Sequence, residues 1–573
     1  MAAGSGNDAL KALSRRLEAL PNVRERLELL ATLEQGPAGM AEELRRALSG
    51  ASEQVLMRDA CPRLLKVWAL HAGGECAERD YYIGAFPAAD DRRAIREALS
   101  VSAETEQGAL VLLVTVDCLR ADRCSCNGYG RPTTPTLDAL AGQGVSFRHA
   151  YATAGQTAQS FPGILMSNFY QSFGRSRLAP PNLTTLAEAL SASGYHTVGI
   201  NAANPHVSRF YEYDRGFDEF YDFCSWRRHD AASNTFTMRV ASLNEQEVNE
   251  ILREFKERPA TYEMLREITG LDSLPLAVRV AKKLLRVDAV QAVKAAFATL
   301  EDGGRRFCWL HLMDVHEPIG LKFSALGCPA RVDQFLLDET ARSDVAARVL
   351  GAGGGKYGEL YDAAVSYTDM ILATLFRHLE DSGLMENALV CVTADHGQEL
   401  LEHGLFGHGY DRLSEEVLHV PLVFSGGLAR RITADPDRPV STLDIAPTIL
   451  EVCGVAEPPQ TFLGTSLNDA RPRPLYGQTF YEGAENRHPG AEGLFALGPF
   501  PRPVKEGAKQ KVFCIQDRAL AVCDLAQGTT ELRRLGHDSR AGTTPETDAA
   551  ALAERARAYL DEVYAGGALR GVA

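Results

Sequence analysis

Three apolar segments of the chain end in carboxylate and imidazole side chains. VTVDCLRAD contains Asp117, HLMDVHEP contains Asp314 and His316, and VTADHG contains Asp395 and His396. Taken alone, each of these residues is as typical of a side chain that caps or braces a loop as of a metal ligand. Neighbouring side chains at a strand end can converge on one ion where the chain turns sharply, and the glycine after His396 permits such a turn. Together, the three strand ends predict a metal site.

The apolar segments themselves predict the strands of an α/β fold. Short β-rich runs such as ALVLLVTVD, YHTVGIN, FCWLHLM, ALVCVTAD and VPLVFSG alternate with helical stretches such as ELYDAAVSYTDMILATLFRHLEDSG. This alternation predicts a mostly parallel sheet with helices on both faces. Such sheets bind ligands beyond the carboxyl ends of their strands, which is where the candidate metal ligands occur.

Periodicity and composition divide the chain into three parts. Residues 1–108 have helical apolar spacing without a chemical motif, and we interpret them as a helical N-terminal extension for packing or oligomerisation. Residues 109–460 contain the strand series of a catalytic α/β domain, interrupted at about 226–300 by an insertion that is predicted to be helical. Residues 461–573 are predicted to form a smaller C-terminal subdomain and tail.

Charge and composition exclude several functional classes. The chain has 573 residues, of which 45% are hydrophobic and 24% charged, as is typical of a soluble globular protein. Its formal net charge of −15 disfavours nucleic-acid binding, which requires a basic face. No run of about 20 apolar residues and no signal-peptide pattern is present, so we expect no membrane span and a cytoplasmic location. The 12 cysteines include no CxxC pair, and the CSC at 124–126 indicates a metal site only weakly.

The order of these motifs resembles that of the sulfatase-like branch of the sulfatase and alkaline-phosphatase superfamily. The resemblance extends over about residues 110–530 and includes TPTLDALAGQGVSF, LAEALSASGYHTVGINAANP, DRGFDEF, HLMDVHEP, YTDMILATL, FGHG and STLDIAPTIL. It implies an alkaline-phosphatase-like sheet, an ester hydrolase, and a divalent ion held by Asp117, Asp395 and His396. It also implies that His316 and His408 contact the transferred group or the leaving oxygen. The motifs are specific for the superfamily but do not name a substrate.

The alignment of this chain with the family's nucleophile segment indicates which residue is the nucleophile. Family members carry it in a Cys-x-Pro-Ser-Arg segment, or in Thr-x-Pro-Ser in unmodified relatives. Laid over AYATAGQTAQSFPGILMS without gaps, that segment gives Thr157 the nucleophile position and Ser160 the position of its serine. A frame shifted by three makes Ser160 the nucleophile but lacks the expected arginine. We therefore favour Thr157, with its oxygen bound to the ion, and interpret Ser160 as a capping or supporting hydroxyl.

Two departures from the family pattern bear on the substrate. Thr157 stands where true sulfatases carry formylglycine, and Phe161 stands where an arginine is expected, so an aldehyde-hydrate nucleophile is not expected. The Gly-Lys-Trp-His segment of arylsulfatases is absent, and INAANPHVS in its place makes Asn204 the candidate donor to the developing negative charge. Arg120 matches a family arginine, with bracing of Asp122 as its alternative role.

The sequence therefore predicts a metal-dependent hydrolase of small anionic phosphate, phosphonate or sulfate esters that acts through a covalent threonine intermediate. Phosphorus esters are favoured, because a threonine ester cannot release sulfate by collapsing to an aldehyde. The alternatives are a sulfatase without formylglycine and a soluble phosphotransferase, and a homo-oligomer is left open. One divalent ion is expected, and the imidazole ligand favours manganese or zinc over calcium or magnesium.

Overall fold

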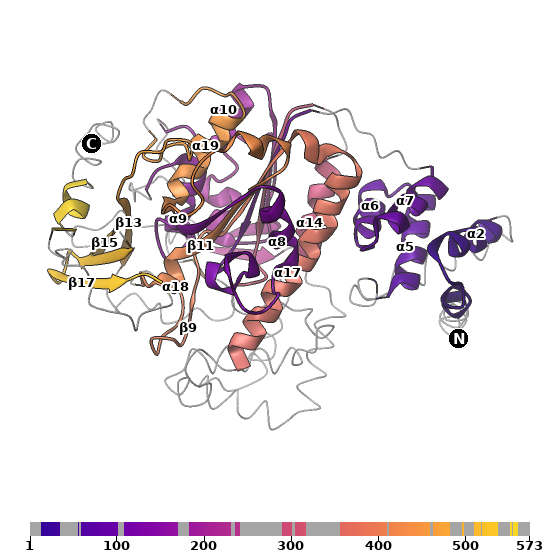
Figure 1. The fold of residues 1–573 in the computed structure, drawn as a ribbon, viewed down its shortest axis with the longest axis horizontal. Coiled ribbons are helices and arrows are strands. Elements are labelled where there is room, and N and C mark those ends of the chain that lie inside the picture. Colours follow the sequence, from indigo (N-terminus) through magenta and orange to yellow (C-terminus); the bar gives the residue numbers. More distant parts are fainter. Residues whose placement is uncertain are drawn as a thin grey trace.

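An eight-stranded, mostly parallel sheet forms the centre of the computed structural model (Figure 1). Its strands lie in the order β12–β2–β11–β8–β1–β7–β3–β4, and only β11 is antiparallel to its neighbours β2 and β8. The strands are β1 (Leu110–Val116), β2 (Val145–Tyr151), β3 (His196–Asn201), β4 (Glu219–Tyr221), β7 (Arg306–Leu312), β8 (Ala388–Thr393), β11 (His419–Ser425) and β12 (Val440–Ser441). The predicted α/β fold is confirmed.

Helices cover both faces of this sheet, which explains why its central strands are buried along their whole length. All residues of β1, β7 and β8 are buried. In Figure 1, α8 (Pro135–Gln143), α14 (Ala289–Thr299) and α17 (Lys356–Asp381) lie on one side of the sheet. The other side carries α9 (Thr157–Met166), α10 (Leu186–Ala192) and α19 (Ile445–Val452).

The register of the three central strands brings their carboxyl ends to one edge. Val116 pairs with Leu312, and Thr115 pairs with Thr393. The residues that follow β1, β7 and β8 therefore emerge side by side. This edge is where the sequence predicts the metal ligands.

The structure describes the chain in segments, and one expected element differs from what it shows. The described residues are 13–34, 56, 59–100, 108–169, 183–230, 235–240, 289–300, 304–316, 356–409, 412–458, 462–481, 496–497, 509–516, 518–536, 551–552 and 554–559. The region expected as a helical insertion begins instead with two antiparallel strands, β5 (Cys224–Asp230) and β6 (Thr235–Val240). The TFTMRV sequence of β6 is rich in residues that favour strands. Residues 241–288 of that region lie outside the described residues.

The N-terminal helices pack on the helical layer of the sheet. They are α2 (Val23–Glu34), α5 (Ala60–Gly73), α6 (Cys76–Gly84) and α7 (Ala89–Ala98), and α6 contacts both α14 and α17. Arg92 of α7 forms a bidentate ion pair with Asp381 at the end of α17, at 2.6 and 2.9 Å. Tyr81 of α6 packs edge-to-face on Phe297 of α14, with ring centroids 6.0 Å apart. These contacts fix α6 and α7 against the central domain.

A separate four-stranded antiparallel sheet follows near the C-terminus. Its strands lie in the order β13–β15–β16–β17, and are β13 (Leu475–Tyr481), β15 (Lys509–Gln516), β16 (Ala519–Asp524) and β17 (Thr529–Arg534). The backbone N–H of Gln478 in β13 donates to the carbonyl of Thr153 at 3.0 Å, so this sheet supports the segment that leads into α9.

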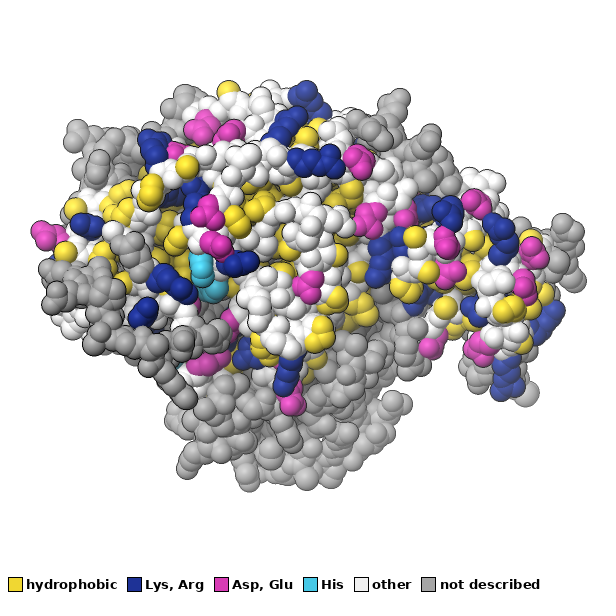
Figure 2. Space-filling model, in the orientation of Figure 1, with side chains coloured by type: hydrophobic (Ala, Val, Ile, Leu, Met, Phe, Trp, Pro, Cys, Tyr) yellow, Lys and Arg dark blue, Asp and Glu magenta, His cyan; other side chains and the backbone are white. Residues whose placement is uncertain are grey.

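Basic and acidic side chains are interspersed over the face of the molecule that Figure 2 shows. None of the described helices is both long enough and apolar enough to cross a membrane.

Candidate active site

The ends of β1 and β8 bring Asp117, Asp395 and His396 together. All three side chains are fully buried. The Nε2 atom of His396 lies 3.4 Å from Asp395 Oδ2 and 3.9 Å from Asp117 Oδ1. One ligand atom from each residue lies within 4.8 Å of the others, which is close enough for a single ion to bind all three.

The hydrogen bonds around these residues fit a divalent ion. Asp117 Oδ1 and Asp395 Oδ2 are buried and have no hydrogen-bond partner, although buried carboxylate oxygens normally have one. His396 Nδ1 lies 2.8 Å from the carbonyl of Gly397, and because a carbonyl only accepts, Nδ1 must carry the proton. His396 Nε2 is then an acceptor facing the two carboxylates. A backbone carbonyl that fixes the tautomer in this way is typical of metal-bound histidine.

The two carboxyl groups differ in their electrostatic surroundings. Burial raises the pKa of Asp395, and the neighbouring charge of Asp117 raises it further. Burial opposes ionisation of Asp117 as well, but the imidazoles of His316, His311 and His396 hold its pKa well below its usual range. Asp117 is thus the carboxylate that stays ionised, while Asp395 needs a nearby cation to do so easily.

Thr157 faces this cluster, whereas Ser160 does not. Thr157 is the first residue of α9, and its Oγ1 lies 3.4 Å from Asp117 Oδ2 and 3.2 Å from His396 Nε2. Ser160, one turn later, donates its hydroxyl to the backbone carbonyl of Asp395 at 2.5 Å. The two hydroxyls therefore have different surroundings, with Thr157 beside the candidate ligands and Ser160 tied to the backbone that carries them.

Asn204 lies in the cluster but is turned toward Asp117. Its Oδ1 accepts the backbone N–H of His206 at 2.9 Å, which fixes the orientation of the amide. Its Nδ2 lies 2.8 Å from Asp117 Oδ2 and 3.2 Å from His311 Nε2. In this geometry the amide of Asn204 supports Asp117. Donation from Asn204 to the substrate stays a prediction.

His311 is a site residue that the sequence reasoning missed. It is buried in β7, its Nε2 lies 3.6 Å from Asp117 Oδ2, and its Nδ1 lies 3.0 Å from Thr115 Oγ1. Thr115 Oγ1 also accepts the indole N–H of Trp309 at 3.0 Å. The histidine in the otherwise apolar run FCWLHLM is the sequence feature that could have indicated a site residue here.

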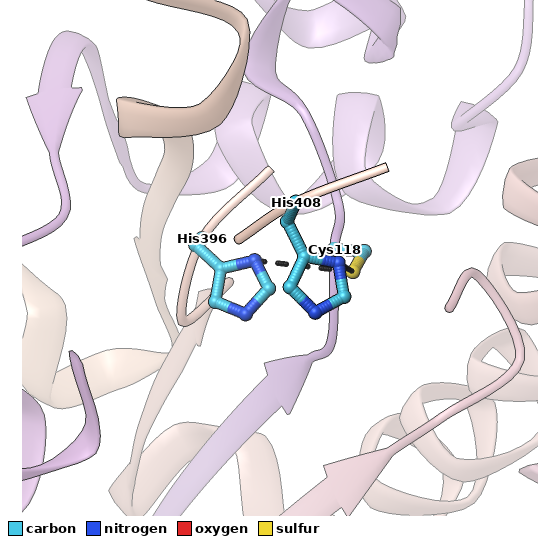
Figure 3. A group of neighbouring side chains, drawn as sticks. All are labelled: Cys118, His396 and His408. Carbon is cyan, nitrogen blue, oxygen red and sulfur yellow. Dashed lines mark hydrogen bonds between the residues drawn. The ribbon is translucent and has the colours of Figure 1, made fainter. Parts of the chain in front are cut away.

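Cys118, His316 and His408 lie next to His396 and Asp117. Cys118 Sγ lies 3.5 Å from His408 Nδ1 and 3.8 Å from His396 Nδ1 (Figure 3). The ring of His408 is centred 4.9 Å from that of His316 and 4.5 Å from that of His396. His316 and His408 are partly exposed, so they form the accessible side of the site.

Arg120 is directed away from the cluster. Its guanidinium forms a bidentate ion pair with Asp122 at 2.8 and 2.6 Å and a second pair with Glu402 at 2.6 Å. It also donates to the carbonyl of Gln398 at 3.0 Å. The geometry thus favours the bracing role over the catalytic one. Among the described residues, Asp314 and the CSC cysteines at 124–126 belong to no group that could hold an ion.

Comparison with known proteins identifies the family. A family model described as Sulfatase matches residues 109–455, more than half of the chain, and the chain belongs to the sulfatase family. The resemblance inferred from the motifs is confirmed.

Individual relatives match shorter stretches. Arylsulfatase K of Danio rerio is 25% identical over 349 residues, which cover 55% of this chain and 59% of the relative's own length. The multifunctional alkaline phosphatase superfamily protein PehA of Trinickia caryophylli is 32% identical over 109 residues, 19% of this chain and 20% of PehA. The solved phosphonate monoester hydrolase of Agrobacterium radiobacter superimposes with a TM-score of 0.50 at 17% identity, covering 80% of this chain and 96% of that one. This last likeness supports the alkaline-phosphatase-like fold.

Proposed function

We propose that this protein is a divalent-metal-dependent hydrolase of small anionic esters, with Thr157 as the nucleophile. The observation that carries the proposal is the position of Thr157 Oγ1, 3.4 Å from Asp117 and 3.2 Å from His396, beside two buried carboxylate oxygens that have no hydrogen-bond partner. Membership of the sulfatase family supports ester hydrolysis.

Asp117, Asp395 and His396 would hold the ion, whose charge lowers the pKa of a bound hydroxyl and polarises an ester oxygen. Manganese or zinc fits the mixed oxygen and nitrogen donors better than calcium or magnesium does. Asn204 keeps Asp117 in place through its 2.8 Å hydrogen bond. Ser160 similarly anchors the first turn of α9 to the backbone of Asp395.

Thr157 then attacks the phosphorus or sulfur atom of the substrate. A bond forms from Oγ1 to that atom while the hydroxyl proton of Thr157 passes to Asp117 Oδ2, which lies 3.4 Å away. The bond to the leaving alcohol breaks, and the alcohol takes up a proton. His316 and His408 line the accessible side of the site, and imidazole is suited to giving that proton near pH 7. The position of Thr157 at the start of α9 also favours negative charge there, because the first N–H groups of a helix are unpaired. Water subsequently hydrolyses the threonine ester.

We further propose that phosphorus esters, in particular diesters and phosphonate monoesters, are better substrates than sulfate esters. An unmodified threonine ester must be hydrolysed at phosphorus or sulfur, without the aldehyde route that releases sulfate from formylglycine. A singly charged ester is also easier to neutralise with one ion than a phosphate dianion is. The relatives include an arylsulfatase and a multifunctional alkaline phosphatase superfamily protein, so their names are compatible with either substrate class.

The test is kcat/KM for matched aryl phosphate, phosphodiester, phosphonate and sulfate esters on one preparation supplied with manganese or zinc. We expect a phosphorus ester to be turned over fastest. An aryl sulfate turned over faster than every phosphorus ester would contradict the proposal and indicate a sulfatase that works without formylglycine.

A further inference from the structure

A short hairpin beside the site carries His408. Its strands are β9 (Glu399–Leu400) and β10 (Phe406–Gly407), which pair antiparallel, and His408 is the residue that follows β10. The hairpin begins directly after the turn formed by His396 and Gly397. The position of the His408 ring therefore depends on how the hairpin is held against that turn.

One buried guanidinium holds the hairpin at its start and at its tip. Arg120 donates to the carbonyl of Gln398, just before β9, at 3.0 Å, and to Oε1 of Glu402 in the tip at 2.6 Å. The other carboxylate oxygen of Glu402 accepts the backbone N–H of Leu400 at 2.5 Å, so this side chain joins Arg120 to the first strand. A Cβ added to Gly397 would lie 2.9 Å from Arg120 Cγ, so the arginine stem packs directly on the turn after β8.

The backbone of Arg120 is itself fixed close to Asp117. Arg120 follows Asp117 by three residues, and its backbone N–H donates to the hydroxyl of Tyr361 at 3.0 Å. The same hydroxyl donates to the carbonyl of Cys118 at 2.6 Å, where the backbone is left-handed with a φ of 63°. Arg120 therefore connects the loop after β1 to the hairpin that carries His408.

The charge of Glu402 makes this connection strong. Burial opposes the positive charge of Arg120, but the carboxylates of Asp122 and Glu402 raise its pKa above the usual value. The guanidinium is thus always charged, and a hydrogen bond between two ionised groups is about twice as strong as one between neutral groups. A neutral side chain at position 402 would leave the buried cation with Asp122 as its remaining carboxylate partner of the two.

The hairpin presents one nitrogen of His408 to the accessible side of the site. Nδ1 lies 3.5 Å from Cys118 Sγ (Figure 3), so Nε2, across the ring, is the nitrogen directed away from the thiol. A proton donor must lie within hydrogen-bond reach of the atom that it protonates, and a displacement of about 1 Å can lower a rate about 100-fold. A hairpin that moves relative to the loop after β1 would therefore carry His408 out of reach.

We propose that Glu402 is a positioning residue, whose ion pair with Arg120 fixes the hairpin so that His408 faces the leaving alcohol. This inference rests on the proposed function, in which His408 lines the accessible side of the site and gives a proton to that alcohol. It deepens the proposed function by adding a residue that acts through His408, and neither on the ion nor on the substrate directly.

The dependence of the rate on the leaving group tests this positioning. 4-Nitrophenolate departs without a proton, whereas the more basic phenolate departs slowly unless it is protonated. The substrates are the 4-nitrophenyl and phenyl esters of phenylphosphonate, or of sulfate if that class is turned over faster, with the full-length protein at saturating manganese. In Glu402→Gln we expect kcat/KM to fall about 10-fold or more for the phenyl ester and less than about threefold for the nitrophenyl ester. A loss of folded protein would lower both rates equally.

Glu188→Gln is the matched control. Glu188 binds the guanidinium of Arg215 at 2.7 and 2.9 Å and accepts the backbone N–H of Thr185 at 2.8 Å, so its partners are of the same kinds as those of Glu402. These partners lie at the start of α10 and in the loop before β4, and not on the hairpin. We expect the ratio of the two rates to equal that of the wild type.

His408→Ala separates this inference from the proposed function. It should lose the phenyl ester selectively, and adding Glu402→Gln to it should not change the ratio further, because both residues act in one step. The inference is overturned if Glu402→Gln keeps the wild-type ratio, or if its effect persists in full in the His408→Ala background. If His408→Ala itself shows no selective loss, the proton transfer in the proposed function fails, and the inference fails with it. Should Glu402→Gln not fold, as judged by circular dichroism, Glu402→Asp keeps the carboxylate at a shorter reach and should show the same selective loss to a smaller degree.

Discussion

Replacing Asn204 by alanine should weaken metal binding. Asn204 donates to an ionised, fully buried carboxylate of Asp117 at 2.8 Å, and its Nδ2 lies 3.2 Å from Nε2 of His311. A hydrogen bond to a charged group contributes about 1.5–3 kcal/mol. Since 1.4 kcal/mol corresponds to a factor of ten, the dissociation constant of the ion should rise roughly 10-fold to 100-fold, as is typical when a partner of a metal ligand is removed.

Competition between the protein and a chromophoric chelator for zinc measures this change. Asn468→Ala is the control, because Asn468 is half-buried and bonds to Thr433, Arg431 and Glu451 instead of to the ligands. Turnover measured at saturating metal should recover most of the activity of Asn204→Ala. If metal affinity is unchanged and turnover is lost at saturation, Asn204 acts on the substrate itself, and its assignment as a support of Asp117 is refuted.

Three further predictions concern the nucleophile, pH and backbone packing. Thr157→Ala should abolish turnover without unfolding, whereas Ser160→Ala should keep measurable activity and lose about 1 kcal/mol of stability, and the reverse pattern of rates would make Ser160 the nucleophile. Burial, aided by a neighbouring guanidinium, lowers the pKa of His378 from 6.5 to about 4, so the folded state resists its protonation. The free energy of unfolding should therefore fall by up to about 3 kcal/mol as the pH drops from 6.5 to 4 in denaturant titrations, and this loss should shrink in His378→Gln. Gly397→Ala should destabilise the fold or the site, because a Cβ there would lie 2.1 Å from the carbonyl of Glu416, and unchanged melting and metal affinity would contradict this.

The sequence predicted the strand ends well because apolar runs followed by polar residues mark the edge of a parallel sheet. Asp117, Asp395, His396 and Thr157 meet there as expected. Gly397 was expected to permit a sharp turn, but the glycine is required chiefly by the close approach of the Glu416 carbonyl. Such an approach joins segments that are far apart in the chain, and no local pattern reveals it.

The roles of Asn204 and His311 could not be predicted for the same reason. Both depend on the pairing of β1 with β7, which places Thr115 opposite His311 and so orients the imidazole toward Asp117. In the sequence, His311 is one polar residue within a buried strand, and the neighbouring residues do not indicate that its side chain contacts Asp117. Asn204 was recognised as a site residue, but only the bond from the His206 backbone shows which way its amide faces.

The long helix α17 contacts both the loop after β1 in the α/β domain and the N-terminal helices, which the sequence indicates as separate parts of the chain. Near its start, Tyr361 holds the backbone of Cys118 and Arg120, and at its end Asp381 binds Arg92 of the N-terminal helices. These two positions are 20 residues apart, or about 30 Å along a helix. A truncated chain that starts at residue 109 would therefore lack Arg92, which binds the C-terminal end of α17. The N-terminal end of the same helix holds the loop after β1. A minimal expressible form of this protein should instead begin before α5.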